Sequence, residues 1–329
     1  MTPEVSVILP VYNRRGMARE AVESVRAQRD IICELIVVDD GSTDGTADEL
    51  EVVAGIAEPA AGISMRVLRS GANRGVAASR NAGIRLARAE LIAFLDSDDL
   101  WAPAKLRRQV DFMRAHPEYL LAQTGELWIR AGRRVNPGSR HQKRAGELFL
   151  PSLRTCLISP SAVILRTALF RAIGGFDETM TAGEDYDLWL RILRDYPAGL
   201  IEEPLVTRRA GHPGQLSAEV PALDRFRILA LLKLLADTGD GAIARTALSR
   251  ERRRAVVEVL TQKCRIYAQG LARRQKTRLA AAINQIADDA PAWVVSADSR
   301  LYAALGWFRA MLAAPCESGL RPSRAEAAA

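Results

Sequence analysis

Short apolar runs alternate with amphipathic stretches through the first two hundred residues of the chain. The runs rich in Val, Ile and Leu predict β-strands, at 5–11, 34–40, 65–70, 90–96 and 159–166. The amphipathic stretches predict helices, at 19–28, 46–54, 76–89 and 183–195. Such alternation is typical of an α/β fold, so we expect a mostly parallel central sheet with helices on both faces.

The pattern of residues changes near residue 220. From there the chain is rich in Leu, Ala and Arg and keeps a helical period almost to its end. We therefore expect three parts, namely an α/β domain over 1–219, a helical C-terminal region over 220–314 and a mobile tail over 315–329.

Polar and glycine-rich residues follow each of the first four predicted strands. They read PVYNR, DDGSTDGT, SGANRG and DSDD, in chain order. Because the carboxyl ends of parallel strands meet at one edge of a sheet, these four segments should lie together, and α/β proteins bind their ligands at that edge. The sequence therefore predicts a binding site there.

Three carboxylates, Asp96, Asp98 and Asp99, follow an apolar run directly and repel one another unless a cation lies near them. A D-x-D pattern offers hard oxygen ligands for Mg²⁺ or Mn²⁺, with water and substrate phosphates completing the coordination shell. Acidic turns and helix caps give the same pattern. Aspartyl-nucleophile phosphatases also carry it, but after their first strand, whereas this pair follows the fourth predicted strand.

Other candidate groups stand in the same kind of position. Asp39 and Asp40 come at the end of the second predicted strand and can accept hydrogen bonds from a base or ribose, although an Asx-turn would look alike. Glu184 and Asp185 begin an amphipathic helix and would stay ionised, as a general base requires, or would only complement the helix dipole. His212 lies in a Gly/Pro loop and is either a surface residue or a metal ligand.

Composition excludes several other classes of protein. The chain is 48% hydrophobic and 26% charged, as globular proteins are. It has no apolar run of about 18 residues, which argues against a membrane-spanning helix, and its start shows no secretory leader. The four cysteines are far apart, so neither a zinc site nor a disulfide framework is expected, and a reducing cytoplasm fits best. Walker A, GxGxxG and GxSxG motifs are missing, which disfavours ATPases, dinucleotide-binding enzymes and serine hydrolases.

The net charge of +7 lies in the C-terminal third. Residues 1–220 hold 28 Lys and Arg against 29 Asp and Glu, whereas residues 221–329 hold 18 against 10. The surplus is either a solvated helical face or an attraction to anionic lipid headgroups or an acidic partner. The basic clusters at 250–254 and 272–278 lack interleaved aromatic residues, so nucleic acid is not expected as a partner.

Six motifs taken together resemble family 2 glycosyltransferases with the GT-A fold. They are VSVILPVYNR, ELIVVDDGSTDGT, NRGVAASRNAGI, FLDSDDLWAPAKL, GGFDE and GEDYDLWLR, in the order and approximate spacing of that family, over residues 5 to about 216. The resemblance implies inverting transfer of a sugar, with a UDP-sugar favoured as donor, to a hydroxyl of a cell-surface polysaccharide, glycolipid or similar acceptor.

The resemblance also implies roles for individual residues. Asp185 would be the catalytic base with Glu184 its neighbour, and Asp98 and His212 would ligate Mg²⁺ or Mn²⁺. The residues implied in donor binding are Pro10, Tyr12, Asn13, Asp39, Asp40, Arg80, Asp96 and Ser97.

Some features of the sequence limit or compete with this interpretation. The Q-x-x-R-W motif and membrane helices of processive members are missing, so we expect addition of a single sugar. Residues 131–150, with His141 and Lys143, predict an irregular loop that either contacts the acceptor or is only a mobile basic loop. The basic C-terminal region would hold a cytoplasmic enzyme against the inner face of the membrane.

Two alternative functions stay open. The first is a non-catalytic nucleotide-sugar sensor or scaffold, which would have no use for a catalytic base. The second is a metal-dependent nucleotidyltransferase, which would need a Gly-rich basic loop after the first strand, where this chain has Arg14, Arg15 and a single Gly.

Overall fold

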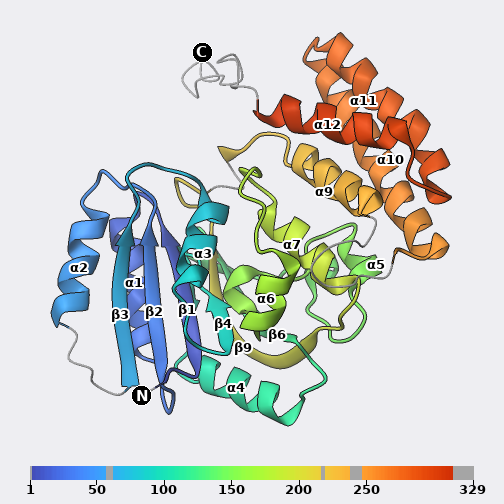
Figure 1. Ribbon diagram of the computed structural model, residues 1–329. Helices are drawn as coiled ribbons and strands as arrows, with labels where there is room; N and C mark the ends of the chain where they lie inside the picture. Colours follow the sequence, from blue (N-terminus) through green and yellow to red (C-terminus); the bar gives the residue numbers. More distant parts are fainter. Residues whose placement is uncertain (1, 57–61, 216–218, 238–246, 314–329) are drawn as a thin grey trace.

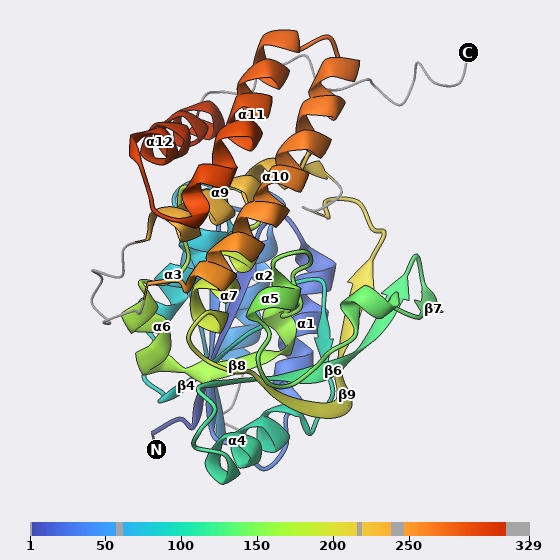
Figure 2. The same ribbon diagram turned by 90° about the vertical axis from the view of Figure 1, so that its right-hand side faces the viewer.

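A computed structural model describes residues 2–56, 62–215, 219–237 and 247–313. Figures 1 and 2 show a curled sheet flanked by helices, with a group of C-terminal helices packed beyond one face of it. The strands in the described residues are β1 Val5–Val11, β2 Cys33–Asp39, β3 Ile63–Arg69, β4 Leu91–Phe94, β5 Leu100–Trp101, β6 Leu121–Arg130, β7 Arg133–Val135, β8 Val163–Arg166 and β9 Gly199–Ala210.

The strands form one sheet in the order β3-β2-β1-β4-β8-β6-β9-β5, with β7 paired to β6. The first four strands of this order run parallel to one another. Strand β8 is antiparallel to both β4 and β6, while β9 runs parallel to β6. The expected α/β fold is therefore confirmed, and the sheet becomes mixed beyond β4.

Helices cover both faces of the sheet, which is why every residue of β1 is buried. Because side chains alternate along a strand, Val7 and Leu9 point into the core beneath one set of helices, while Ile8 points into the opposite core. The helices of this part are α1 Arg15–Arg26, α2 Thr46–Ile56, α3 Val76–Arg85, α4 Lys105–Ala115, α5 Phe149–Ser152, α6 Thr167–Ile173 and α7 Glu184–Leu193.

The C-terminal region is helical, as expected. Its helices are α9 Asp224–Ala236, α10 Arg250–Arg273, α11 Thr277–Asp289 and α12 Ser299–Ala313. Helix α9 is buried on most sides because it lies between α7, α10 and α12, and its apolar residues join the same core as α3, α6 and α7. No helix in the described ranges is long and apolar enough to cross a bilayer. The expected tail over 315–329 lies outside the described residues.

The region between β4 and β8 differs most from the expected pattern. Residues 131–150 are not wholly irregular, because they contain β7, which pairs with the end of β6. Figure 2 shows the β6–β7 ribbon projecting from the body of the sheet beside β9. The polar residues Gln123, Thr124 and Glu126 interrupt the apolar pattern of β6, which explains why its periodicity is weak.

Candidate active site

Side chains from distant parts of the chain meet at the carboxyl ends of β1, β2 and β4. Asp98 contacts Arg14 and His212, and Arg80 joins Asp96 to Glu184, next to Asp185. The acidic turn, the start of α7 and His212 therefore lie together in the fold, although about a hundred residues separate them in the sequence.

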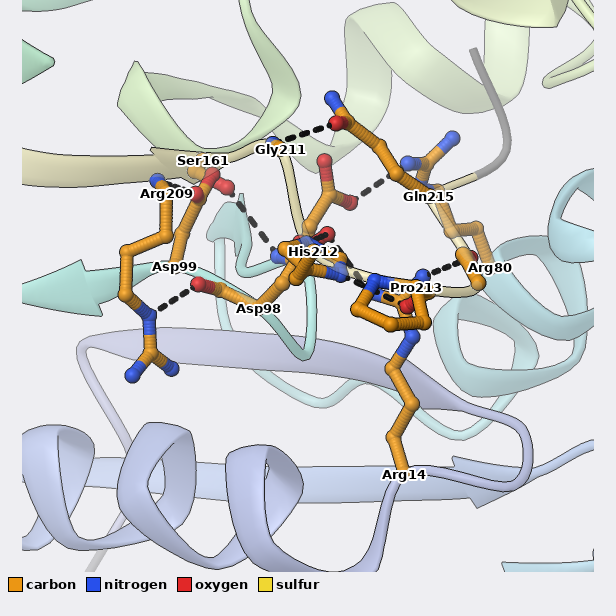
Figure 3. Close-up of polar contacts among 12 residues, drawn as sticks. Arg14, Arg80, Asp98, Asp99, Ser161, Arg209, Gly211, His212, Pro213 and Gln215 are labelled. Atoms are coloured by element: carbon orange, nitrogen blue, oxygen red, sulfur yellow. Dashed lines mark hydrogen bonds and ion pairs between the residues drawn. The ribbon is translucent and has the colours of Figure 1, made fainter. Parts of the chain in front are cut away.

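Asp98 lies between two basic side chains (Figure 3). Its Oδ2 atom is 2.6 Å from Arg14 Nη1 and 2.9 Å from His212 Nε2. Loop 211–215 carries the histidine back over the strand ends after β9, and Gly211 N donates to Gln215 Oε1 at 2.9 Å within that loop. The fold thus brings together the carboxylate of Asp98, from the turn after β4, and the imidazole of His212, from the loop after β9.

Asp98 and His212 fit a divalent metal ion. His212 Nδ1 lies 2.9 Å from the carbonyl oxygen of Pro213, and a hydrogen bond from Nδ1 to that oxygen would leave Nε2 able to ligate on the side of Asp98. In the described part of the chain, no group of three or more His, Cys, Asp or Glu is placed to hold a metal. Mg²⁺ and Mn²⁺ accept one or two protein ligands when substrate phosphates and water complete the shell, so two ligands are enough.

Arg80 joins the turn after β4 to the start of α7. Its guanidinium is 2.7 Å from Asp96 Oδ1 and 2.7 Å from Glu184 Oε1, and only 4% of its side chain is exposed. The ring of Phe176 packs against the guanidinium with its centroid 5.1 Å from Cζ. Because Arg80 is so buried and already paired, it acts on the site by positioning Asp96 and Glu184.

Asp99 has a different environment from its two neighbours. It is buried, and it accepts a hydrogen bond from Arg209 N at 3.0 Å. Burial raises the pKa of Asp99 to about 8, and the charges of Asp98 and Asp96 add to the effect. A neutral Asp99 removes one of the three negative charges from this turn.

The two acids that begin α7 also differ from each other. Glu184 is buried against Arg80, and desolvation raises its pKa to about 7, the guanidinium opposing the shift. Asp185 is partly exposed, with Oδ1 accepting from Tyr186 N at 2.7 Å and Oδ2 lying 3.7 Å from the Cys156 thiol. Of the two, Asp185 is the more accessible to solvent.

Asp39 and Asp40 serve different purposes in the loops after β2 and β3. Asp40 accepts from the backbone N–H groups of Arg74 and Gly75, at 2.9 and 2.8 Å, and so joins the two loops. Asp39 accepts from Ser42 N through Oδ2, whereas its buried Oδ1 has no hydrogen-bond partner among the described residues. Gly41 allows the loops to approach, because a Cβ there would lie 2.9 Å from the backbone carbon of Ala72.

The remaining expected donor residues lie at the same edge with different exposure. Tyr12 is 44% exposed, and Asn13 beside it accepts from Thr43 N at 2.8 Å. Pro10 and Ser97 are buried, the first inside β1 and the second in the turn after β4. Tyr12 is therefore the side chain in this group that offers an exposed aromatic ring.

The loop expected near the acceptor has one residue with an internal role. Lys143 has only 11% of its side chain exposed, pairs with Glu126 Oε1 at 3.0 Å and donates to Leu157 O and Ser159 Oγ. Its ammonium group therefore stabilises the protein's interior.

Two side chains near this loop were not expected from the sequence, Trp128 on β6 and Arg208 on β9. The Arg208 guanidinium lies 4.9 Å over the Trp128 ring, and His141 packs near the same ring at 5.4 Å. Burial lowers the pKa of Arg208, but the surrounding carboxylates, Asp185 among them, raise it above its usual value. An aromatic residue and a basic residue near the predicted catalytic carboxylate would have been the sequence signal for these two positions. That signal cannot be seen in the sequence, because only the pairing of β6 with β9 brings Trp128 and Arg208 together.

Known proteins resemble this chain over more than half of its length. An uncharacterized glycosyltransferase of Rickettsia felis is 34% identical over 202 residues, which are 61% of this chain and 32% of that protein. The succinoglycan biosynthesis protein ExoO of Rhizobium meliloti is 32% identical over 196 residues, 56% of this chain and 54% of that protein. The chain therefore spans about a third of the first of these relatives and about half of the second.

Solved structures share the fold at low sequence identity. Residues 1–349 of Staphylococcus aureus TarS in complex with UDP-GlcNAc match with a TM-score of 0.68 at 20% identity, covering 93% of this chain and 87% of that one. The mannosyltransferase PcManGT of Pyrobaculum calidifontis, in complex with GDP-Man and Mn²⁺, matches with a TM-score of 0.56 at 19% identity, covering 94% and 87%. The sequence pattern of glycosyl transferase family 2 matches residues 6–172, about half of the chain, and the chain belongs to that family.

Proposed function

We propose that this protein is a metal-dependent, inverting glycosyltransferase that moves a single sugar from a nucleotide-diphosphate sugar to an acceptor hydroxyl. One observation carries the proposal. The Asp98–His212 pair and the partly exposed Asp185 share one edge of the sheet, joined through Asp96, Arg80 and Glu184. A binding protein would need the first pair but would have no use for the carboxylate on the other side.

The donor side of the site suits a nucleoside diphosphate. Tyr12 is exposed beside the strand ends, and the unpaired Oδ1 of Asp39 is an acceptor suited to an N–H of a base. Asp40 has both carboxylate oxygens in use for the loops, so we propose Asp39 as the residue that reads the base. Structural neighbours bind UDP-GlcNAc and GDP-Man, and a UDP-sugar is the donor that we favour here.

The chemistry follows from the separation of charge across the site. Mg²⁺ or Mn²⁺ held by Asp98 and His212 would stabilise the charge that grows on the departing diphosphate. Asp185 takes the proton from the acceptor hydroxyl as that oxygen attacks the anomeric carbon, opposite to the leaving group. A single displacement of this kind inverts the configuration at that carbon and needs no covalent intermediate.

The acceptor would approach from the side of Asp185 that faces the β6–β9 ribbon. Trp128 and His141 offer aromatic surfaces there, and Arg208 offers a cation held against the indole ring. Since a relative is a succinoglycan biosynthesis protein, we propose a growing polysaccharide or a lipid-linked precursor as the acceptor.

A cationic corner on the C-terminal helices would hold the protein near such an acceptor. Where α10 turns into α11, four exposed basic side chains make no ion pair with another described residue; they are Arg273, Arg274, Lys276 and Arg278. We propose that this corner contacts anionic lipid on the cytoplasmic face of the membrane.

Two substitutions test the catalytic proposal. Asp185→Asn should lower sugar transfer by about a thousandfold or more, because it removes the proton acceptor, while binding of UDP with Mn²⁺ changes little. Asp98→Asn should lower sugar transfer and should also weaken Mn²⁺-dependent binding of UDP.

The donor is first found by thermal-shift screening of UDP-, GDP- and dTDP-sugars with Mn²⁺, and transfer is then measured on the full chain. Near-normal transfer by Asp185→Asn would show that another group is the base, and nucleotide-sugar binding without turnover by the unaltered protein would favour a sensor.

A further inference from the structure

Asp98 already pairs with a cation that belongs to the protein. Arg14 Nη1 lies 2.6 Å from Asp98 Oδ2, and the two side chains are only 16% and 15% exposed. Figure 3 shows the Arg14 side chain rising from the start of α1 toward the acidic turn and loop 211–215. The contact joins residues 84 positions apart and lies in the site where we place the metal.

The position of Arg14 is held from both ends. Its backbone N–H donates to Thr46 Oγ1 at 3.2 Å, and its Nη2 donates to the carbonyl oxygen of Gly214. Asn13, directly before it, takes a left-handed conformation with φ of 47° and turns the chain from β1 into α1. The guanidinium is therefore aimed at Asp98 by the fold and is more than a surface side chain making a passing contact.

This contact conflicts with metal binding by Asp98. The oxygen that accepts from Arg14 is the same Oδ2 that faces His212 Nε2, the other proposed ligand. A guanidinium and a divalent cation repel each other, most strongly where little water separates them. A metal ion that binds Asp98 has to move the Arg14 guanidinium away from this oxygen.

We propose that Arg14 acts as an internal counter-ion, which occupies Asp98 until the metal arrives together with the diphosphate of the donor. The inference rests on the proposed function. Displaced from Asp98, the guanidinium remains at the strand ends, where it can pair with phosphate oxygens, which Arg binds well. Arg14 thus disfavours metal alone and favours metal with a nucleoside diphosphate, and so couples the two binding events.

Mn²⁺ binding without any nucleotide tests this directly. Arg14→Gln in the full chain should bind Mn²⁺ about tenfold more tightly than the unaltered protein, the equivalent of ~1.4 kcal/mol. Binding is measured as the loss of the free Mn²⁺ signal in electron paramagnetic resonance. In calorimetry at saturating Mn²⁺, the same variant should bind UDP about tenfold more weakly, because the phosphate partner is lost. The opposite signs of the two effects distinguish this role from general damage to the site.

Arg15→Gln is the matched control. Arg15 is the next residue, is 63% exposed and pairs with Glu49 on the surface, so its loss should change neither affinity. Arg14→Lys keeps a cation, but its side chain is shorter and it pairs less strongly with a carboxylate. Its Mn²⁺ affinity should therefore lie between those of the unaltered protein and Arg14→Gln. If thermal melting shows that Arg14→Gln does not fold, the Lys variant decides the question on its own.

Equal or weaker Mn²⁺ binding by a folded Arg14→Gln or Arg14→Lys would overturn the inference. Asp98→Asn separates that result from a failure of the proposed function. If Asp98→Asn loses Mn²⁺ binding while the Arg14 variants gain none, the metal site stands and the counter-ion role falls. If Asp98→Asn still binds Mn²⁺ normally, the metal site itself is wrongly assigned, and the counter-ion role falls with it.

Discussion

At the scale of single residues, the three acids of the DSDD turn avoid mutual repulsion in three ways. Asp96 pairs with Arg80, Asp98 with Arg14 and His212, and Asp99 is buried so that its pKa rises to about 8. Burial of an unpaired acid favours its neutral form, whereas a nearby guanidinium favours the charged form. One short turn therefore combines a carboxylate paired with Arg80, the proposed metal ligand and a neutral structural acid.

Arg80 is the residue whose loss should affect this arrangement most. Arg80→Met leaves Asp96 and Glu184 without their shared cation, and breaking a buried ion pair in this way costs about 3–5 kcal/mol. Arg80→Lys keeps the charge but cannot reach both carboxylates, so it should lose transfer rate more than UDP affinity. Urea unfolding gives the stability, and steady-state kinetics gives kcat and KM separately.

Arg85→Met on the same helix is the control for Arg80. Its side chain is 62% exposed and lies 3.7 Å from Glu178, so its loss should change the free energy of unfolding by less than about 1 kcal/mol. An Arg80→Met variant as stable as this control would contradict the positioning role.

At the scale of elements, α7 is held by α9 through a partly buried ionic contact. Lys233 of α9 lies 2.6 Å from Asp187 of α7 and 2.6 Å from Asp177 in the GGFDE segment. Arg191 adds a second cation on Asp187, at 2.8 Å. Since α7 carries Asp185, the C-terminal region supports the helix that presents the proposed base.

This contact predicts a dependence of stability on acid. Burial works to raise the pKa of Asp177, but Lys233 and the hydrogen bonds from Lys233 and Thr179 lower it to about 2. A carboxylate with a folded pKa below its unfolded value stabilises the fold above the unfolded value, near pH 4, and loses that contribution as pH falls toward 2. Asp177→Asn should therefore lower the free energy of unfolding by ~2 kcal/mol at pH 6 and by much less at pH 2.5.

Urea unfolding at a series of pH values measures the difference between Asp177→Asn and the unaltered chain. Glu178→Gln is the neighbouring control, since Glu178 makes only longer ion pairs, at 3.5 and 3.7 Å, with Arg74 and Arg85, and the Gln amide oxygen can still accept the hydrogen bond from Asn81 Nδ2. A difference for Asp177→Asn that stays constant from pH 6 to pH 2.5 would mean that the Lys233 contact does not stabilise the fold.

At the scale of the whole molecule, charge is distributed unevenly between the two parts. The α/β part is nearly neutral, whereas the C-terminal helices carry the surplus, and Figure 2 shows α10 and α11 extending away from the sheet. A cationic corner at the α10–α11 turn can thus approach an anionic surface. Because α9 buries its apolar side chains against α7, removing the C-terminal region would expose the core, so charge substitution is the sounder test.

Flotation with vesicles tests the proposed membrane contact. Changing the four basic residues of the corner to Gln in the full chain should abolish binding to phosphatidylcholine vesicles that contain phosphatidylglycerol, because each basic residue contributes ~1 kcal/mol near such a surface. Binding by the unaltered chain should also fall with added salt. A matched change of exposed Arg133 and Arg134 on β7 should have little effect. The proposed membrane contact would be wrong if all forms of the protein floated equally, or if none of them floated with vesicles of either composition.

The sequence by itself determined the elements from β1 to β4 and the edge where polar residues gather. Runs of Val, Ile and Leu broken by DDGSTDGT or DSDD are local features, and the parallel direction of β1, β2, β3 and β4 follows from their alternation with helices. Their order in the sheet was known only from the structure. Helix α7 and the helical character of the C-terminal region were likewise predictable from period alone. Strand β6 was not assigned, because buried polar residues hide its pattern.

Tertiary structure alone decided which partner each functional group has. Arg14 reaches Asp98, Arg80 joins Asp96 to Glu184, and Lys143 turns inward, since each contact joins residues brought together only by folding. The same holds for Asp39, whose unpaired oxygen is visible only once the loops are in place. Residue type and spacing determine local conformation, whereas the charge state and accessibility of a side chain depend on neighbours that are distant in the chain.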